Sequence, residues 1–525
     1  MEKDQKRENH KGITVNVASY TYVSISCCCF DILSQRTRNP FRDDEYLPIS
    51  SDSSIPVCGL PRVRVTGIPE QKENVGRESP DKFDVLVQIK APSMSEYPEH
   101  PLKRAPIDLV MVLDINERVD AIMLAHIRNS VCFAIDNLGE LDRLSIAWSC
   151  PRRIFPLRRM TEKGRKYTKQ IVRAHVFADG PTDAVEILMT AARILEQRRY
   201  RNTAAFIIIL SNRKEPPASS TNREEPLDYL DKLPDSIYPY PEANNAKRDV
   251  FPVYSFGIGV DHEPVALHTL SSTTGGTYSF VETTEILQDA IAYCIGNLLA
   301  VVNVDFSITF TRGTAEVVLV DVKAGDYYTI VRGKGSSGDI KVQNLFADET
   351  LSFLIDVAVN RRTVERMESH LILDWKYKDA VVSSGVGEVQ YRCTIDLHPI
   401  SNIAEVELNR KRTLLLGADW IDNALKIAEA KGVKDAKNFL FTECRNCSDS
   451  VYMWILERIR EVARRMAAED GMVRTGWQAF GLSTLSACDT QRAATTGSRA
   501  QGAEFDPFGT PNTVAMVTKS RSVQN

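Results

Sequence analysis

The chain has 525 residues, of which 43% are hydrophobic and 26% are charged, and its formal net charge is −4. This length allows two or three hydrophobic cores, and the small net charge gives no electrostatic bias toward nucleic acid. The eight histidines are scattered along the chain, so the composition does not indicate a zinc or haem cluster.

Residues 1–60 are predicted to form a disordered or poorly ordered lead. Residues 12–30 carry no charge, follow a basic stretch and include Cys27, Cys28 and Cys29, so a lipid-modified membrane anchor is an alternative. The Ser, Thr and Asn residues within this stretch disfavour partition into a bilayer core, and we expect no membrane role. Cysteines expected to be reduced and a missing secretion signal predict a cytoplasmic protein.

Two strand patterns follow the lead. The first covers residues 83–90. The second is the apolar run that ends at Asp114, and it predicts a strand covered on both faces in a parallel sheet. A carboxylate just past such a strand lies at the sheet edge where open α/β folds bind ligands. Apolar residues at helical spacing over 119–138 predict a helix whose N-terminus points at Asp114.

This arrangement resembles the von Willebrand factor type A (VWA) domain. In that family, an Asp-x-Ser-x-Ser loop after an apolar strand joins a Thr and an Asp from later loops in a metal-ion-dependent adhesion site. Further segments fall in the order of plant members, in particular the "wavy growth" type RING/VWA ubiquitin ligases: 141–147, 155–161, 180–182, 206–212, 254–259, 275–281 and 288–296. The resemblance implies an α/β, Rossmann-like VWA domain with a central, mostly parallel sheet and helices on both faces.

The residues at the implied metal site depart from the family pattern. Asp114 and Thr182 match, but Asn116 and Arg118 replace the two loop serines, and Asn212 replaces the distal Asp. The exchanges remove one negative charge and add a guanidinium that has no lone pair to offer. Each charge is worth about 4 kcal/mol at about 4 Å and an effective dielectric of about 20. We therefore expect a degenerate site without metal, and Mg²⁺ or Mn²⁺ only if these residues are still competent.

Two arrangements of Arg118 are open. In the first, its guanidinium occupies the space of the missing ion and pairs with Asp114, which would otherwise be a costly buried carboxylate. In the second, Arg118 turns outward to solvent or to Glu117, and Asp114 caps the following helix through backbone amides.

Ubiquitin-ligase activity of the RING type is not supported by the sequence, and we expect no enzyme. The ligase relatives carry a RING finger ahead of the VWA domain, which needs eight Cys or His ligands in paired elements. Before Asp114 there is no CxxC pair, and the Cys and His residues there are His10, Cys27, Cys28, Cys29, Cys58 and His100. Cys444 and Cys447 form a CxxC pair, but the sequence has no second CxxC pair that could complete a zinc site with it.

The remaining chain is divided by its changes of hydrophobic period. Residues 61–104 contain the first strand, which in the relatives pairs with material after the VWA domain. That domain is expected at 105–299, with a surface loop over 214–248. Alternating strands separated by turns predict an antiparallel β-sandwich at 300–410. A helical region is predicted at 411–488, where Gly432 separates two helices, and a disordered tail at 489–525.

A search for catalytic motifs finds none. Gly257 and Gly259 follow a late strand without a third glycine, so they do not predict a nucleotide site. The glycine-rich residues 333–338 lie between strands, where a hairpin turn explains them. Arginine pairs at 152–153 and 158–159 are interpreted as solvated faces, with a patch for an acidic partner as the alternative.

Three functional hypotheses remain. The first is a non-catalytic protein-binding module whose partner, of unknown identity, meets residues 114–118, 179–183 and 212–214 without a bridging metal. The second is a substrate-recognition component of ubiquitin transfer that acts with a RING-containing homologue. The third is a decaying duplicate without a selected role.

Overall fold

The computed structural model describes a large part of the chain. The described residues are 45–47, 61–70, 81–97, 104–115, 119–148, 154–176, 184–214, 230–238, 250–359, 370–381, 388–397, 403–446, 453–469, 475–492, 494–497 and 507–524. All of them belong to the unit that spans Phe41–Asn525. The expected lead, including Cys27 to Cys29, lies outside the described residues apart from 45–47.

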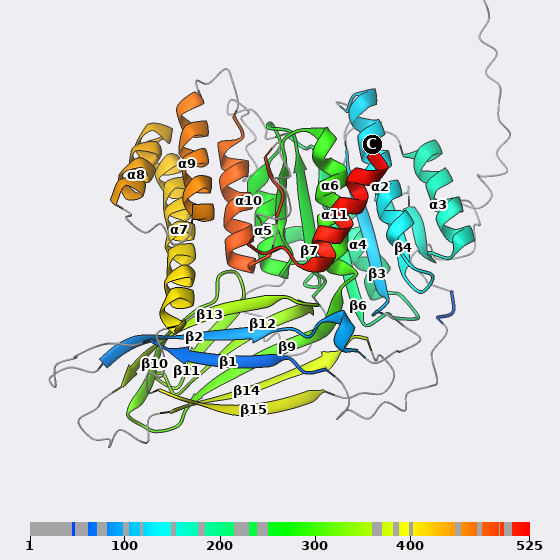
Figure 1. Cartoon of the computed structure of the whole chain (residues 1–525). Coiled ribbons are helices and arrows are strands. Elements are labelled where there is room, and N and C mark those ends of the chain that lie inside the picture. The colour runs from blue at the N-terminus through cyan, green and yellow to red at the C-terminus, as the bar shows by residue number, and fades with distance from the viewer. Residues whose placement is uncertain are drawn as a thin grey trace, which may run out of the picture. The chain divides into compact units, whose positions relative to one another are not determined.

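The described residues form a seven-stranded sheet in the spatial order β16-β8-β7-β6-β3-β4-β5. Its central strands β7, β6, β3 and β4 are labelled in Figure 1. Neighbouring strands are parallel, except that β5 runs antiparallel to β4. The strands are β3 (Ile107–Asp114), β4 (Arg143–Trp148), β5 (Ile154–Arg159), β6 (Ala204–Ser211), β7 (Val253–Ile258), β8 (Tyr278–Val281) and β16 (Thr496–Gly497). The predicted mostly parallel sheet is confirmed.

Side chains of β3 alternate between two hydrophobic cores, because successive residues of a strand point to opposite faces. Leu109 and Met111 pack in the core that contains residues of α2, α3 and α6. Val110 and Val112 pack in the core that contains residues of α4, α5 and the later helices. The helices of this domain are α2 (Ala121–Asn137), α3 (Glu162–His175), α4 (Ala184–Glu196), α5 (Pro264–Thr274) and α6 (Leu287–Leu298), with 3₁₀ turns at Leu230–Lys232 and Thr284–Ile286.

Two antiparallel sheets form the predicted β-sandwich. Their strand orders are β1-β2-β13-β10 and β11-β12-β9-β14-β15. The strands are β1 (Arg64–Pro69), β2 (Asp81–Lys90), β9 (Val301–Arg312), β10 (Val317–Lys323), β11 (Tyr328–Arg332), β12 (Ser337–Phe346), β13 (Thr350–Val359), β14 (His370–Asp379) and β15 (Val389–Asp396), and a 3₁₀ turn follows β2 at Met94–Glu96. β2 pairs with β13 along its whole length. The chain therefore leaves the sandwich after β2, forms most of the α/β domain and returns.

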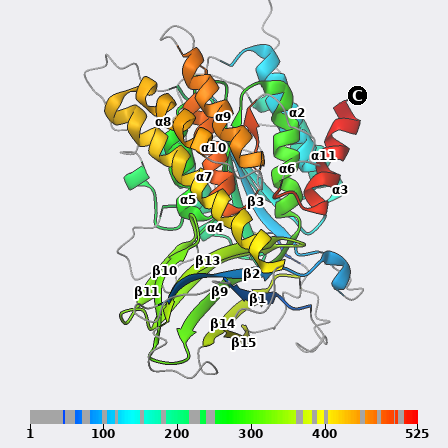
Figure 2. The same cartoon turned by 60° about the vertical axis from the view of Figure 1, so that its left-hand side comes forward.

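The later helices cover one face of the α/β domain and reach the sandwich (Figure 2). They are α7 (Ile403–Lys431), α8 (Val433–Asn446), α9 (Met453–Ala468) and α10 (Trp477–Thr490). The last helix, α11 (Pro511–Gln524), lies on the other side of the sheet, against α6 and α2. Gly432 separates α7 from α8 with a φ of 98°, a backbone conformation that favours glycine. Leu408 of α7 packs against Leu86 and Leu354 of the four-stranded sheet. No helix among the described residues is both long enough and apolar enough to cross a membrane.

Two sequence expectations need correction. The predicted surface loop at 214–248 includes a buried part, in which Leu230, Leu233 and Ile237 pack into the core. The tail expected to be disordered from residue 489 contains β16 and α11. It also contains the buried Arg492, whose guanidinium donates to Glu349 and to the carbonyl oxygen of Asn344. The composition of the tail, with few large apolar groups, gives no sign of anchoring by polar contacts.

Candidate functional site at the carboxyl edge of the sheet

The candidate site is built where β3 and β6 end side by side. The parallel register places Asp114 opposite Ser211. The Ser211 hydroxyl donates to Oδ2 of Asp114 at 2.8 Å, and the backbone N–H of Arg213 donates to the same hydroxyl oxygen at 3.2 Å. Asp114 is 2% exposed and Asn212 is 9% exposed. Strand pairing thus fixes the first carboxylate of the implied site beside the end of β6.

The structure brings together two of the five predicted site residues. Asn212 follows directly after Ser211, and its N–H donates to the carbonyl oxygen of Asp114 at 3.4 Å. Asn116, Arg118 and Thr182 lie outside the described residues. The pairing of Arg118 with Asp114 therefore stays a prediction.

The helix after β3 begins later than the site loop and has its own cap. α2 starts at Ala121, and the side chain of Asp120 accepts a hydrogen bond from the N–H of Met123 at 2.7 Å. The suggestion that Asp114 caps this helix is therefore wrong, because Asp120 is its N-cap. An Asp just before the apolar periodicity was the sequence signal for this role.

The loop after β7 supports the end of β6. Lys214 pairs with Asp261, and the N–H of Glu263 donates to the carbonyl oxygen of Arg213 at 2.8 Å. Lys214 also forms a β-bridge with His262. The sequence placed Arg213 and Lys214 in the expected partner face, but it did not identify Asp261, His262 or Glu263, because no motif marks them.

His262 is a buried, neutral link in this loop. Its Nδ1 lies 2.5 Å from the carbonyl oxygen of Gly259, and its Nε2 lies 2.6 Å from the hydroxyl of Tyr278. Because a carbonyl can only accept, Nδ1–H donates to Gly259, and Nε2 accepts from Tyr278. Burial lowers the pKa of His262 to about 4. A Cβ on Gly257 would lie 2.0 Å from Nε2 of His262, so glycine at 257 makes room for the ring.

Within the part of the chain that the structure describes, Asp114 and Asn212 are the donors at the implied metal site. Mg²⁺ prefers about six oxygen ligands, and anionic ones supply much of the attraction. Asp114 is the carboxylate at the end of β3, whereas β6 is followed by an amide, Asn212, and then by the cations Arg213 and Lys214. Among the described residues, no group of three or more His, Cys, Asp or Glu side chains could hold a metal ion.

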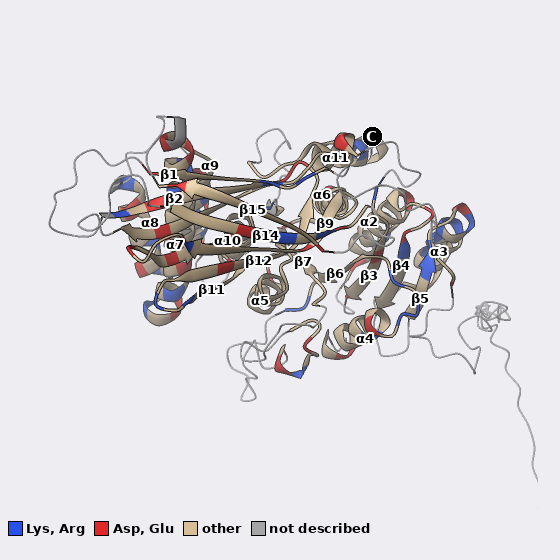
Figure 3. Ribbon diagram, turned by 90° about the horizontal axis from the view of Figure 1, so that it is seen from below, with Lys and Arg blue, Asp and Glu red and all other residues tan. Residues whose placement is uncertain are grey.

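Other candidate motifs have structural roles or lie outside the described residues. Residues 333–336 form the turn of the β11–β12 hairpin, in which Arg332 pairs with Ser337, so the predicted turn is confirmed. Cys444 lies in α8, while its expected partner Cys447 is not described. Lys and Arg residues are visible on α3 and β5 in Figure 3, and the N–H of Arg159 donates to Glu45 at 2.7 Å.

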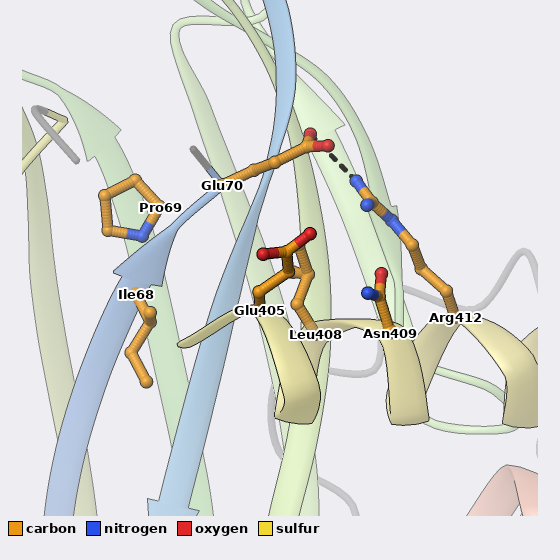
Figure 4. Close-up of a pocket in the computed structure, with 7 residues that line it drawn as sticks. All are labelled: Ile68, Pro69, Glu70, Glu405, Leu408, Asn409 and Arg412. Atoms are coloured by element: carbon orange, nitrogen blue, oxygen red, sulfur yellow. Dashed lines mark ion pairs between the residues drawn. The ribbon is translucent and has the colours of Figure 1, made fainter. Parts of the chain in front are cut away.

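A small cleft lies between β1 and α7, within the β-sandwich part of the chain (Figure 4). Arg412 on its wall pairs with Glu70 at 2.8 Å and with Asp84 at 2.5 Å. Its lining is completed by Ile68, Pro69, Glu405, Leu408 and Asn409. Because both carboxylates contact the same guanidinium, the cleft is explained as an ion-paired junction that holds α7 against β1 and β2.

Comparisons with known proteins agree with this architecture. No family model matches the chain. The chain is 28% identical over 266 residues to E3 ubiquitin-protein ligase WAV3 of Arabidopsis thaliana, and the match covers 49% of this chain and 32% of WAV3. It is 27% identical over 334 residues to the probable E3 ubiquitin-protein ligase WAVH2 of the same plant, covering 60% of this chain and 42% of WAVH2. The chain thus matches less than half the length of each of these relatives.

Among solved structures, the chain resembles a von Willebrand factor type A protein from Catenulispora acidiphila. The TM-score is 0.54 at 15% sequence identity, and the match covers 83% of this chain and 97% of that protein. At this identity the likeness establishes the fold. The chain therefore has the fold of a von Willebrand factor type A protein and is similar in sequence to the plant ubiquitin ligases of the WAV3 type.

Proposed function

We propose that the chain is a non-catalytic protein-binding protein, and that its VWA domain meets a partner protein through a degenerate adhesion site without a bridging metal ion. The observation that carries this proposal is the pairing of Asp114 with Ser211 beside an Asn at position 212. The Ser211 hydroxyl and the Asn212 amide hold the ends of β3 and β6 together without adding a negative charge beside Asp114. The proposal further assigns Asn116 and Arg118 to the same edge.

The charges around Asp114 support a protein partner in place of an ion. A cation at this edge would be attracted by Asp114 and repelled by Arg118, where the proposal places it, while Lys214 is already compensated by its ion pair with Asp261. A partner protein can satisfy both signs, because carboxylates, amides and guanidinium groups are all available on protein surfaces. Lys214 and Asp261, whose side chains are 43% and 40% exposed, form an ion pair that such a partner can reach.

The metal-free site is tested by thermal unfolding with and without 10 mM Mg²⁺ or Mn²⁺. The wild-type Tm should not change, since a ligand stabilises a protein only by binding its native state. The variant Asn116→Ser, Arg118→Ser, Asn212→Asp restores the family's ligands and should gain about 1.4 kcal/mol if its Kd is about tenfold below the metal concentration. A rise of several degrees in the wild-type Tm would show that the site still binds metal.

Partner binding at this edge is tested by affinity capture from plant extract. Lys214→Glu reverses a half-exposed charge at the edge and should reduce the captured partner at least about tenfold, as expected for loss of about 1.4 kcal/mol. Lys434→Glu makes the same change on an exposed position of α8 and should leave capture unchanged. Equal losses, or none, would move the interface away from the carboxyl edge.

The likeness to WAV3 and WAVH2 favours a second candidate, a substrate-recognition component of ubiquitin transfer that works with a RING-containing homologue. The capture experiment separates the candidates. Ubiquitin-conjugating enzymes or RING ligases in the captured fraction support this second role. Reproducible capture of other proteins alone supports the first. Failure to capture any protein reproducibly would contradict both roles and favour a decaying duplicate.

A further inference from the structure

Helix α11 lies along a surface formed by α2 and α6 (Figures 1 and 2). Its buried residues, Thr513, Val517 and Ser520, recur at steps of four and three, so they share one helical face. Gly296 of α6 permits a close approach, because a Cβ there would lie 3.0 Å from Cα of Thr513 and 3.1 Å from Cβ of Met516. We call the receiving surface, with Phe133, Asn137, Gln288, Asp289, Ala292 and Gly296, the α2–α6 surface.

The apolar part of this contact is small, and it touches the larger core through the partly buried Met516. Val517 packs with Phe133 and Ala292 in a cluster of their own, against which Tyr293 and Met516 are partly buried. Val517 is the large apolar side chain that α11 buries fully.

The polar part of the contact is specific. Asp289, which is 8% exposed, accepts from the Ser520 hydroxyl at 2.6 Å and from Nε of Arg521 at 3.0 Å. The amide of Gln288 donates to the Ser520 hydroxyl at 3.2 Å. At the edge, Lys519 donates to the side-chain oxygen of Asn137 at 2.6 Å. Asp289 therefore favours a helix that presents a hydroxyl followed by a cation, as α11 does with Ser520 and Arg521.

These features make α11 a detachable helix. Isolated helices of 14 residues are marginal in water, so α11 depends on its contact for most of its stability. The contact buries Val517 fully and Met516 partly and adds a few hydrogen bonds, so we expect the helix to open without global unfolding.

We propose that the α2–α6 surface is a helix-binding site, occupied in cis by α11, and that a partner helix of the same chemistry competes for it. The partner helix carries a small residue in the place of Thr513 and a branched aliphatic residue in the place of Val517. A hydroxyl and an arginine follow in the places of Ser520 and Arg521. This is recognition of an amphipathic helix by a shaped surface.

Because α11 belongs to the same chain as the α2–α6 surface, a partner helix can bind there only after a change weakens the contact of α11. A segment that belongs to the same chain as its site can act at an effective concentration on the order of 1 mM. A free helix at about 1 μM is therefore excluded from the wild-type surface unless α11 is weakened.

The test uses the full chain and a fluorescein-labelled peptide that spans residues 507–525. Val517→Asp removes the buried anchor of α11, while Val523→Asp makes the same change on the same helix at a side chain that is 66% exposed. Fluorescence anisotropy should show the peptide binding to the Val517→Asp chain at least about tenfold more tightly than to the wild type or to Val523→Asp. Equal binding to the two variants overturns the proposal.

Charge recognition is tested on the Val517→Asp chain. A peptide with Arg521→Glu should bind at least about tenfold more weakly than the wild-type peptide, because it places a carboxylate against Asp289. Unchanged affinity would mean that the peptide binds elsewhere, and it would refute the assigned surface.

Hydrogen exchange decides whether α11 is separable from the domain. In the Val517→Asp chain, exchange should rise in α11 and α6 while β3 and β6 stay protected as in the wild type. A rise throughout β3 and β6 would show that Val517 belongs to the folding core, and the proposal of a detachable helix would then be wrong.

Discussion

β3 carries a buried carboxylate near each end, and the two have different partners. Asp108, at the amino end, accepts from Nε and Nη2 of Arg143 at 2.8 and 2.7 Å, and from Arg198 at 2.7 Å. The side-chain amide of Asn202 donates to it at 2.9 Å. Asp114, at the carboxyl end, accepts from the neutral hydroxyl of Ser211.

Asp108 is held by two cations inside the fold, whereas the described partner of Asp114 is a neutral hydroxyl at the loop-bearing edge of the sheet. Asp108 is fully buried among two cations and an amide, so any change in the group leaves charges without compensation. The edge at Asp114 is completed by loops, and a loop can exchange its residues without disturbing the sheet. The departures at Asn116, Arg118 and Asn212 therefore fall where the fold tolerates them.

The largest expected effect is at the amino end. Asp108→Asn leaves Arg143 and Arg198 buried without their counter-charge, and it should lower the free energy of unfolding by about 3–5 kcal/mol. Urea unfolding measures this. Asp374→Asn is the control, because its partner Arg392 is 71% exposed, and it should change stability by less than about 1 kcal/mol. If both variants lose a similar free energy of unfolding, Asp108 matters no more to stability than the carboxylate of an exposed ion pair.

An intermediate effect is expected from pH at the carboxyl edge. His262 has a folded pKa of about 4, whereas an unfolded histidine titrates near 6.5. Between these values the unfolded chain binds the proton and the folded chain does not, so stability falls as pH decreases below about 6.5. The loss at pH 5 is about 2 kcal/mol for this group.

Urea unfolding of His262→Gln at pH 7 and pH 5 checks this contribution. The variant should lose about 2 kcal/mol less than the wild type between the two pH values. His268, whose pKa burial also lowers to about 4, is a matched second site, and His268→Gln should give a similar reduction. A His262→Gln variant with the wild-type pH dependence would show that the ring titrates normally in the folded protein.

The smallest effect is expected for Asp114→Asn. The amide retains an oxygen that can accept from Ser211, and the edge is open to loop adjustment, so the loss should stay below about 1.5 kcal/mol. Asp108→Asn and Asp114→Asn make the same substitution at the two ends of β3, so their free energies of unfolding compare the two ends directly. If Asp114→Asn costs as much as Asp108→Asn in urea, the carboxyl edge is also a closed structural site.

The sequence predicted the elements whose signals are local. The apolar run into Asp114 predicted β3, and Gly432 marked the boundary between α7 and α8. The VWA fold and the sandwich followed from the resemblance and from the change to period two. The strands and the helix boundary depend on periodicity and turn chemistry, which a single sequence carries, whereas the VWA fold needed the family resemblance.

The parts that escaped prediction depend on distant contacts. Ser211 was overlooked beside the expected Asn212, because its role comes from the register of β3 with β6. Arg492 and α11 are placed by hydrogen bonds and ion pairs with residues more than a hundred positions away. A short polar segment gives no periodic signal for such contacts, so composition alone suggested disorder.

The pairing of β2 with β13 sets an order for folding. Lys90 pairs with Thr350, so 260 residues separate the two partners. At a synthesis rate of about 5–20 residues per second, β2 waits roughly 15–50 s on the ribosome before β13 is made. Domains generally fold as units, so the α/β domain can complete its parallel sheet in that interval. The β1–β2 hairpin meanwhile presents an unpaired edge, and the sandwich is the part of this chain most exposed to misassembly during synthesis.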